Sequence, residues 1–213
     1  MIMRPADDSA ERSPLVKRGI QLSYATIGYN SVEAVASLVA GVLANSVSLV
    51  GFGADSLIEV AAGGVAQWRL RSDADETRRH AAERRAHRII GWSFLALAIY
   101  ILADSTHSLW QHDAPARSWF GMVILGLSIV VMPLLARAKR NVARRLASSA
   151  LEAEATQTSL CAYLSVIALL GVALNWLLGW WWADPVAALM MVPIVGNEAF
   201  EGIRGEKNCD AGC

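Results

Sequence analysis

The 213-residue sequence has little of what a soluble or secreted protein depends on. Only 18% of its residues are charged and 54% are hydrophobic, and the mean hydropathy is positive, a composition too apolar for an ordinary soluble domain of this length. Three cysteines are too few for the disulfide framework of a small secreted domain. The 19 basic and 19 acidic residues give a formal net charge of zero, which by itself says nothing about nucleic-acid partners. We expect no such partner. The composition indicates an integral membrane protein.

What the sequence has instead is six long apolar runs. A bilayer core requires about 20 mostly apolar residues per helix, and backbone groups within lipid must be hydrogen-bonded inside the segment. The approximate spans are 20–44, 47–68, 89–110, 119–136, 151–178 and 185–203. We therefore predict an all-α membrane protein, a bundle of six transmembrane helices.

The basic residues predict the orientation of these spans. Every Lys and Arg except Arg117 lies before the first span, in the second-to-third or fourth-to-fifth connection, or after the sixth span. Short loops rich in Lys and Arg stay in the cytoplasm, and their charges also suit anionic lipid head groups. We therefore expect both termini of this multi-pass protein in the cytoplasm.

The same pattern divides the chain into three parts. We expect residues 1–19 to form a polar N-terminal leader, residues 20–204 the six-helix transmembrane domain, and residues 205–213 a short cytoplasmic tail that contains Cys209 and Cys213. We find no domain boundary inside 20–204.

Two carboxylates interrupt the second span. Asp55 and Glu59 lie in the apolar stretch LVGFGADSLIEV, residues 49–60, and a spacing of four puts both on one helix face. A carboxylate deep in a bilayer is costly unless it pairs, binds a cation or lines water. The alternative is that both acids are protonated and hydrogen-bonded, or reach an interface. Two acids at coordination spacing favour a cation site.

The fifth span offers a facing set of ligands. Glu154, Gln157 and Cys161 follow an i, i+3, i+7 pattern in LEAEATQTSLCAYLS and share one stripe of a helix. Glu154 and Cys161 can ligate a metal, and Gln157 offers a carbonyl oxygen, although Cys161 is equally compatible with a small buried apolar residue. Opposite the second span, this stripe completes a site suited to a divalent transition metal.

Polar residues on two other spans are secondary candidates. Glu33, three residues after Asn30 in the first span, either borders the same pathway or bonds a neighbouring helix. Asp104 and His107, three apart near the outer end of the third span, either form an exit-side station for metal or protons or meet interfacial water.

The sixth span begins with a structural signal. In GWWWADP, residues 179–185, Asp184 is expected to accept hydrogen bonds from free amide groups at a helix start, and Pro185 occupies a position whose N–H is not needed. The three tryptophans suit the interfacial aromatic belt of a membrane protein.

These segments together resemble the transmembrane region of the cation diffusion facilitator (cation efflux) family, over roughly residues 15–205. The resemblance rests on NSVSLVGFGADSLIEV, ALEAEATQTSLCAYLS and GWWWADPVAAL. In that family the transport site joins an acid pair on the second helix to a His-x-x-x-Asp pair on the fifth. Asp55 and Glu59 match the first pair, whereas the second falls on Gln157 and Cys161. The thiol softens the site, and Glu154, one turn earlier, is expected to join it.

The resemblance implies a function. It indicates efflux of a divalent transition-metal cation, with Zn²⁺ as the expected cargo, in exchange for protons and by alternating access. The small size of the chain together with this resemblance favours a bacterial inner membrane. The chain resembles the short, transmembrane-only branch without a C-terminal cytoplasmic domain, and a homodimer is one expectation. We predict no prosthetic group and no enzymatic activity, since HExxH and Gly-x-Ser-x-Gly motifs are absent from the sequence. The alternative is a non-transporting metal-binding membrane sensor or accessory subunit.

Overall fold

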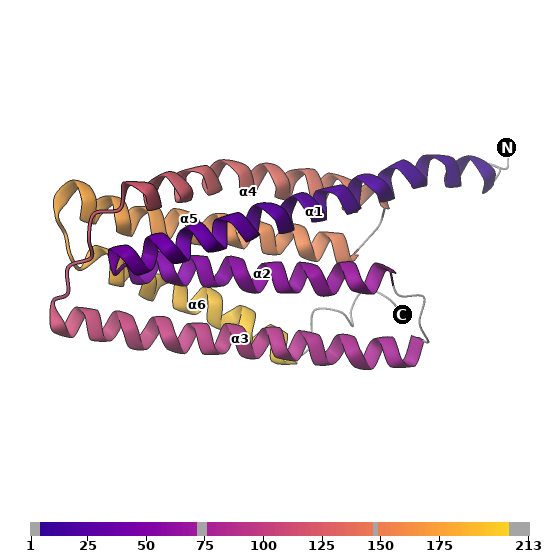
Figure 1. Ribbon diagram of the computed structural model, residues 1–213. Coiled ribbons are helices and arrows are strands. Elements are labelled where there is room, and N and C mark those ends of the chain that lie inside the picture. The colour runs from indigo at the N-terminus through magenta and orange to yellow at the C-terminus, as the bar shows by residue number, and fades with distance from the viewer. Residues whose placement is uncertain (1–4, 72–75, 147–148, 205–213) are drawn as a thin grey trace.

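The computed structural model describes residues 5–71, 76–146 and 149–204, and within them it contains six helices and no strand (Figure 1). The helices are α1 (Pro5–Ala44), α2 (Val47–Arg71), α3 (Glu76–Gln111), α4 (Trp119–Leu146), α5 (Ser149–Leu178) and α6 (Ala183–Arg204). Each contains a segment long and apolar enough to cross a membrane. The prediction of an all-α, six-helix membrane protein is confirmed.

Three helices extend far beyond the apolar runs predicted to cross the bilayer. α1 begins at Pro5, α3 begins at Glu76, and α4 continues to Leu146, because Ala, Arg, Glu and Lys favour the helix even where they no longer face lipid. Much of the basic sequence assigned to connections is therefore helical. The extension of α4 carries Lys139 into the bundle.

Short turns follow the ends of α1 and α5, at the end of the bundle opposite the start of α1 (Figure 1). Asn45, between α1 and α2, has a φ of 51°, and the following Ser46 donates its N–H to the Gly41 carbonyl at 2.9 Å. Asparagine is one of the few residues that tolerates this left-handed conformation. Gly179 ends α5 with a φ of 67° and donates to the Asn175 carbonyl at 3.0 Å, a glycine helix cap.

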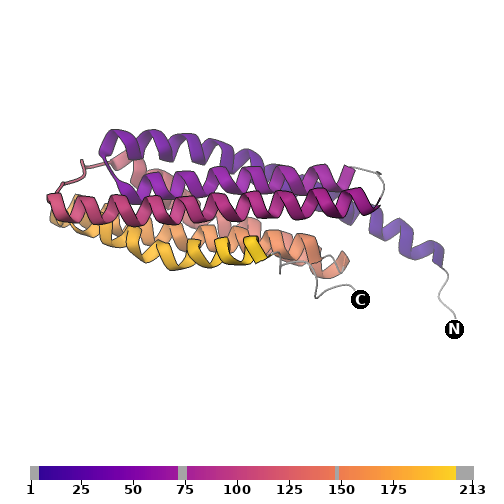
Figure 2. The same cartoon turned by 90° about the horizontal axis from the view of Figure 1, so that it is seen from below.

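The helices run along a common axis, and the start of α1 and the end of α6 point to the same end of the bundle (Figures 1 and 2). The most extensive contacts join α3 to α6, α4 to α5 and α1 to α2. α2 also contacts α3, α5 and α6. The helix that carries Asp55 and Glu59 therefore has neighbours on several sides within the bundle.

The surface of the bundle is apolar and much of its interior is polar. Val32, Leu43 and Trp110 are 72, 79 and 84% exposed, as expected for side chains that face lipid. Several serines are completely buried instead: Ser37, Ser48, Ser56, Ser105, Ser128 and Ser165. Small and polar residues at helix contacts allow close packing and hydrogen bonding in membranes.

Gly53 sets the distance between α1 and α2 next to the predicted metal ligands. A Cβ atom at this position would lie 2.8 Å from the backbone nitrogen of Leu38 and 3.0 Å from the Cβ of Ser37, so a larger residue would force the helices apart. This close approach brings Glu33 of α1 against Ser56 of α2, one residue from Asp55.

Candidate metal centre

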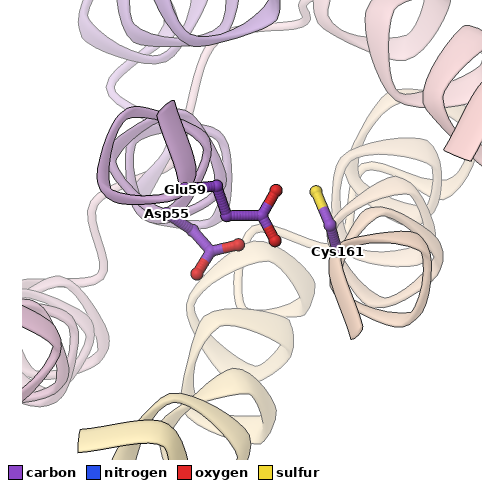
Figure 3. A group of neighbouring side chains, drawn as sticks. All are labelled: Asp55, Glu59 and Cys161. Atoms are coloured by element: carbon purple, nitrogen blue, oxygen red, sulfur yellow. The ribbon is translucent and has the colours of Figure 1, made fainter. Parts of the chain in front are cut away.

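Three potential metal ligands converge between α2 and α5. One oxygen each of Asp55 and Glu59 and the sulfur of Cys161 all lie within 4.8 Å of one another. Figure 3 shows the Glu59 carboxylate between the Asp55 carboxylate and the Cys161 thiol. The three residues are 4, 8 and 0% exposed. The acid pair predicted from its spacing and the thiol predicted from the fifth span thus meet inside the bundle.

Residues of α1 hold one side of this cluster. Asn30 donates its Nδ2–H to Glu59 Oε2 at 2.7 Å. Ser56 donates to Glu33 Oε2 at 3.0 Å, and the Cys161 sulfur lies 3.9 Å from the same oxygen. The other carboxylate oxygen of Glu33 is buried without a hydrogen-bond partner among the described residues. Glu33 therefore adjoins the three ligands and presents an additional oxygen in their immediate surroundings.

Asp55 occupies a different environment. Its carboxylate has no hydrogen-bond or ion-pair partner within the described part of the chain, although it is 4% exposed. It lines a small cavity together with Glu59, Gln157 and Glu198, and the remaining walls are apolar: Phe94, Leu160, Leu164, Ile194 and Val195. The space open to the centre of a water-sized sphere is ≈ 10 Å³, which is about what one water molecule requires.

The donor set suits a divalent transition metal. Two carboxylates and a thiol combine hard oxygen donors with a soft sulfur donor, a mixture that binds Zn²⁺ and softer ions such as Cd²⁺ better than Mg²⁺ or Ca²⁺. Buried carboxylates without a compensating group are costly in a membrane. A cation bound here would offset that cost.

Glu154 does not join the three ligands. Its Oε2 lies 3.2 Å from the Lys139 ammonium and accepts a 2.7 Å hydrogen bond from Ser23. It lies two helical turns before Cys161, whereas Gln157 faces the cavity. The stripe predicted on the fifth span therefore divides: Glu154 contacts α1 and α4, and Gln157 and Cys161 face the cavity and the acid pair.

Lys139 was missed in the sequence because it was assigned to a cytoplasmic loop. It is 2% exposed, and besides the Glu154 ion pair its ammonium donates to Thr158 at 3.4 Å. The sequence contained a signal, because the spacing of Met132, Ala136, Lys139 and Ala143 continues one helical face of α4 past the apolar run. All four residues are buried.

Glu198 was also missed. It lies in the sixth predicted span, after a long run of mostly apolar residues, and it lines the cavity beside Asp55. The sequence signal was its spacing of seven and three residues from Met191 and Val195, because residues three, four or seven apart share a helix face. Both of these residues are buried.

The candidates on the third span lie apart from the three ligands. Asp104 accepts a hydrogen bond from the Tyr100 hydroxyl at 3.0 Å, and the Nε2 of His107 lies 3.1 Å from the Gln111 amide nitrogen. Each thus bonds to a neighbour one turn away on α3, and His107 is exposed on the outer surface of the bundle. Cys209 and Cys213 lie outside the described residues.

Asp184, at the start of α6, is also a buried acid. Its carboxylate accepts hydrogen bonds from the Ser46 hydroxyl at 2.7 Å, from the Val47 backbone N–H at 2.9 Å and from the Ser48 hydroxyl. The structural role expected for Asp184 is thus fulfilled at the N-terminus of α2, a different helix from the one that Asp184 begins.

Comparisons with known proteins agree with this architecture. The family described as "Cation efflux transmembrane domain" matches residues 23–204. Transmembrane protein 163 of Xenopus laevis is 28% identical over 137 residues, which cover 63% of this chain and 48% of that protein, so the chain spans about half the length of this curated relative. Because the family match covers most of the chain, including all three converging ligands, the protein belongs to the cation efflux family.

Proposed function

We propose that this protein exports a divalent transition-metal cation from the cytoplasm of a bacterial cell in exchange for protons, with Zn²⁺ as the principal cargo. Membership of the cation efflux family indicates cation transport in general. The observation that carries the finer proposal is the convergence of Asp55, Glu59 and Cys161 within 4.8 Å. A thiol beside two carboxylates selects for transition metals over the more abundant Mg²⁺ and Ca²⁺.

The exchange for protons follows from the chemistry of these ligands. Carboxylates and thiolates bind a metal only when deprotonated, so metal binding releases protons and protonation releases the metal. Because the proposed mechanism uses no prosthetic group, the acids themselves couple the flux of metal to the flux of protons. Protons that reach Asp55 and Glu59 from outside would displace the cation there, and cytoplasmic metal would displace the protons.

The surroundings of the ligands support alternating access. Glu59 is held by Asn30 of α1, whereas Asp55 has no such restraint within the described residues. The ligands come from two helices, so a change in the relative tilt of α2 and α5 would alter the coordination and open the site to one side at a time. Gln157 lines the same cavity and offers an amide oxygen beside these ligands. We leave Glu154 out of the ligand set because its carboxylate pairs with Lys139.

Purified protein reconstituted into vesicles loaded with a metal-sensitive dye tests the proposal. Zinc, cadmium, cobalt, manganese and iron are supplied outside, with and without a pH gradient. We expect Zn²⁺ flux that a pH gradient accelerates and that Asp55→Asn and Glu59→Gln remove. Asp104→Asn, at an acid that bonds to Tyr100 instead, is the control and should retain flux.

The result also separates the alternative function. Metal binding in detergent that depends on Asp55 and Glu59 without any flux in vesicles would indicate a membrane sensor or an accessory subunit. Unaltered flux in both acid variants would contradict the proposed site.

A further inference from the structure

The cavity beside Asp55 is lined in part by α6, a helix that contributes none of the three ligands Asp55, Glu59 and Cys161. Its polar lining comes from Asp55 and Glu59 of α2, Gln157 of α5 and Glu198 of α6. The other lining residues are apolar, so these four side chains are the polar groups that a cation in the cavity would meet. Glu198 is a carboxylate on a third helix, facing the same space as the acid pair.

Glu198 and Asp55 are close enough to influence one another. Both side chains line the same small cavity. Asp55 is almost fully buried and has no partner within the described residues. Two ionised carboxylates that face one small apolar cavity repel each other, and either protonation of one of them or a cation between them removes the repulsion. The buried, unpartnered Asp55 and the cavity are independent observations, and both indicate a cation ligand at this place.

The depth of Glu198 along the bundle follows from the Asp184 contacts. Because Asp184 bonds to Val47, α2 and α6 start at the same level. At ~1.5 Å per residue, Asp55 lies about 12 Å beyond that level on α2, Glu59 about 18 Å beyond it, and Glu198 about 21 Å beyond Asp184 on α6. Glu198 is therefore farther than Asp55 from the outer turns, on the side where the basic residues predict the cytoplasm.

Exposure agrees with this order. Asp55 and Glu59 are buried, whereas Glu198 and Gln157 are partly exposed. A cation arriving from the predicted cytoplasmic side would meet the two partly exposed residues before it reaches Asp55. One of them offers a carboxylate and the other an amide oxygen, and both are oxygen donors that bind partly hydrated divalent cations.

We propose that Glu198 and Gln157 form a loading position for divalent cations, from which the ion passes to Asp55, Glu59 and Cys161. This inference rests on the proposed function, because it assigns one stage of metal transfer to Glu198. Glu198 attracts the ion into the cavity and exchanges part of its water shell for protein oxygens. The three central ligands then complete the coordination, so Glu198 determines how fast the site fills and empties.

The test measures the kinetics of Zn²⁺ binding in detergent by stopped flow, together with flux in vesicles. Clefts of one charge sign raise association rates by 10-fold or more, so we expect Glu198→Gln to slow Zn²⁺ association by about tenfold. Dissociation should slow by a similar factor, which leaves the equilibrium affinity within about threefold of the wild type. Flux should then require higher Zn²⁺ concentrations to reach half of its maximum.

Glu201→Gln is the matched control, one turn along the same helix. Glu201 accepts a 2.7 Å hydrogen bond from Asn197 and does not line the cavity, so its variant should bind and transport like the wild type. Glu198→Asp, which keeps the charge, should recover most of the association rate. Recovery by Asp and a symmetric size-exclusion peak for the Gln variant separate a loading role from a folding defect.

Three outcomes would overturn the inference. Unchanged association in Glu198→Gln would remove Glu198 from the path of the ion. A loss of equilibrium affinity as large as that in Asp55→Asn would make Glu198 a permanent ligand of the central site. Equal slowing in Glu201→Gln would indicate a general surface-charge effect. If wild-type vesicles show no flux, the proposed function fails, whereas the stopped-flow comparison still tests the loading position.

Discussion

Asp55 and Asp184 are both aspartates buried in the membrane-spanning bundle, at 4 and 1% exposure, and their surroundings are opposite. Asp184 accepts hydrogen bonds from two serine hydroxyls and a backbone N–H at the start of α2. That position is also the positive end of the helix dipole, where a carboxylate is stabilised. Asp55 has no partner within the described residues and faces Glu59 and Glu198 across a small cavity.

The difference separates an acid with a structural role from one that we propose to be functional. Buried polar groups in folded proteins are almost always hydrogen-bonded, and each exception requires an explanation. Asp184 satisfies this rule and ties α6 to the α1–α2 turn. Asp55 has no such partner within the described residues and opens onto the small cavity instead, where a bound cation would supply one. Sites of this kind reduce stability in exchange for function.

The largest expected effect is the loss of metal handling in Asp55→Asn. In the metal-bound protein, the Asp55 carboxylate and the cation would form a buried charge pair. Removing one member of such a pair costs about 3–5 kcal/mol, so Zn²⁺ affinity should fall by at least about a hundredfold. The thermal midpoint of the metal-free protein should stay the same or rise, because the variant removes a buried ionisable group that has no partner within the described residues. Isothermal titration and thermal unfolding in the same detergent measure both. A clear fall in the metal-free midpoint would place Asp55 with Asp184 as a structural acid.

Asp184→Ala should produce the reverse pattern. It removes the acceptor of several buried donors at the start of α2, and each unsatisfied donor costs about 1–3 kcal/mol. We expect a lower thermal midpoint, a destabilisation of about 3 kcal/mol and unchanged Zn²⁺ affinity in the fraction that remains folded. Ser48→Ala is a milder companion variant. The comparison fails if Asp184→Ala loses metal affinity while keeping its stability.

Lys139→Met tests whether Glu154 is a compensated acid like Asp184. The side chains of Lys139 and Glu154 are 3 and 17% exposed, so removing the lysine leaves a largely buried carboxylate without its charge partner, at a cost of about 2–3 kcal/mol. The double variant Lys139→Met/Glu154→Gln should recover much of that loss. A double-mutant cycle of unfolding free energies gives the coupling. Additive effects would show that the ion pair contributes nothing to stability.

The smallest of these effects is expected for Cys161→Ser, which keeps the size of the side chain and replaces the soft sulfur donor by oxygen. Cd²⁺ affinity should fall by about tenfold or more and Zn²⁺ affinity by less, because the softer ion depends more on sulfur. The thiolate-to-cadmium absorbance in the ultraviolet should disappear with it. Retained absorbance would assign that sulfur to Cys209 or Cys213, which a variant lacking both would then verify.

The local features of the site could be predicted from the sequence. Asp55 and Glu59 share a face because they are four residues apart on a helix, whatever packs against that helix. Cys161 belongs to the same stripe as Gln157 for the same reason. The six spans follow from the length of apolar sequence that a bilayer requires. These properties depend on residues close together in the chain.

Long-range pairings could not be predicted in the same way. Glu154 was expected at the metal site, but the continuation of α4 brings Lys139 to it at 3.2 Å. Asp184 was expected to serve a helix start, and packing places its carboxylate on the N-terminus of α2. Glu198 faces the cavity beside Asp55 because α6 packs against α2.

The sequence alone therefore determined which residues are available on each helix face, because a helix repeats every 3.6 residues wherever it is. The tertiary structure decided which acids found a partner and which did not. That outcome depends on the rotation and relative height of each helix against its neighbours. Contacts such as the one at Gly53 set both, because α1 and α2 are so close there that a single added methyl group would force them apart.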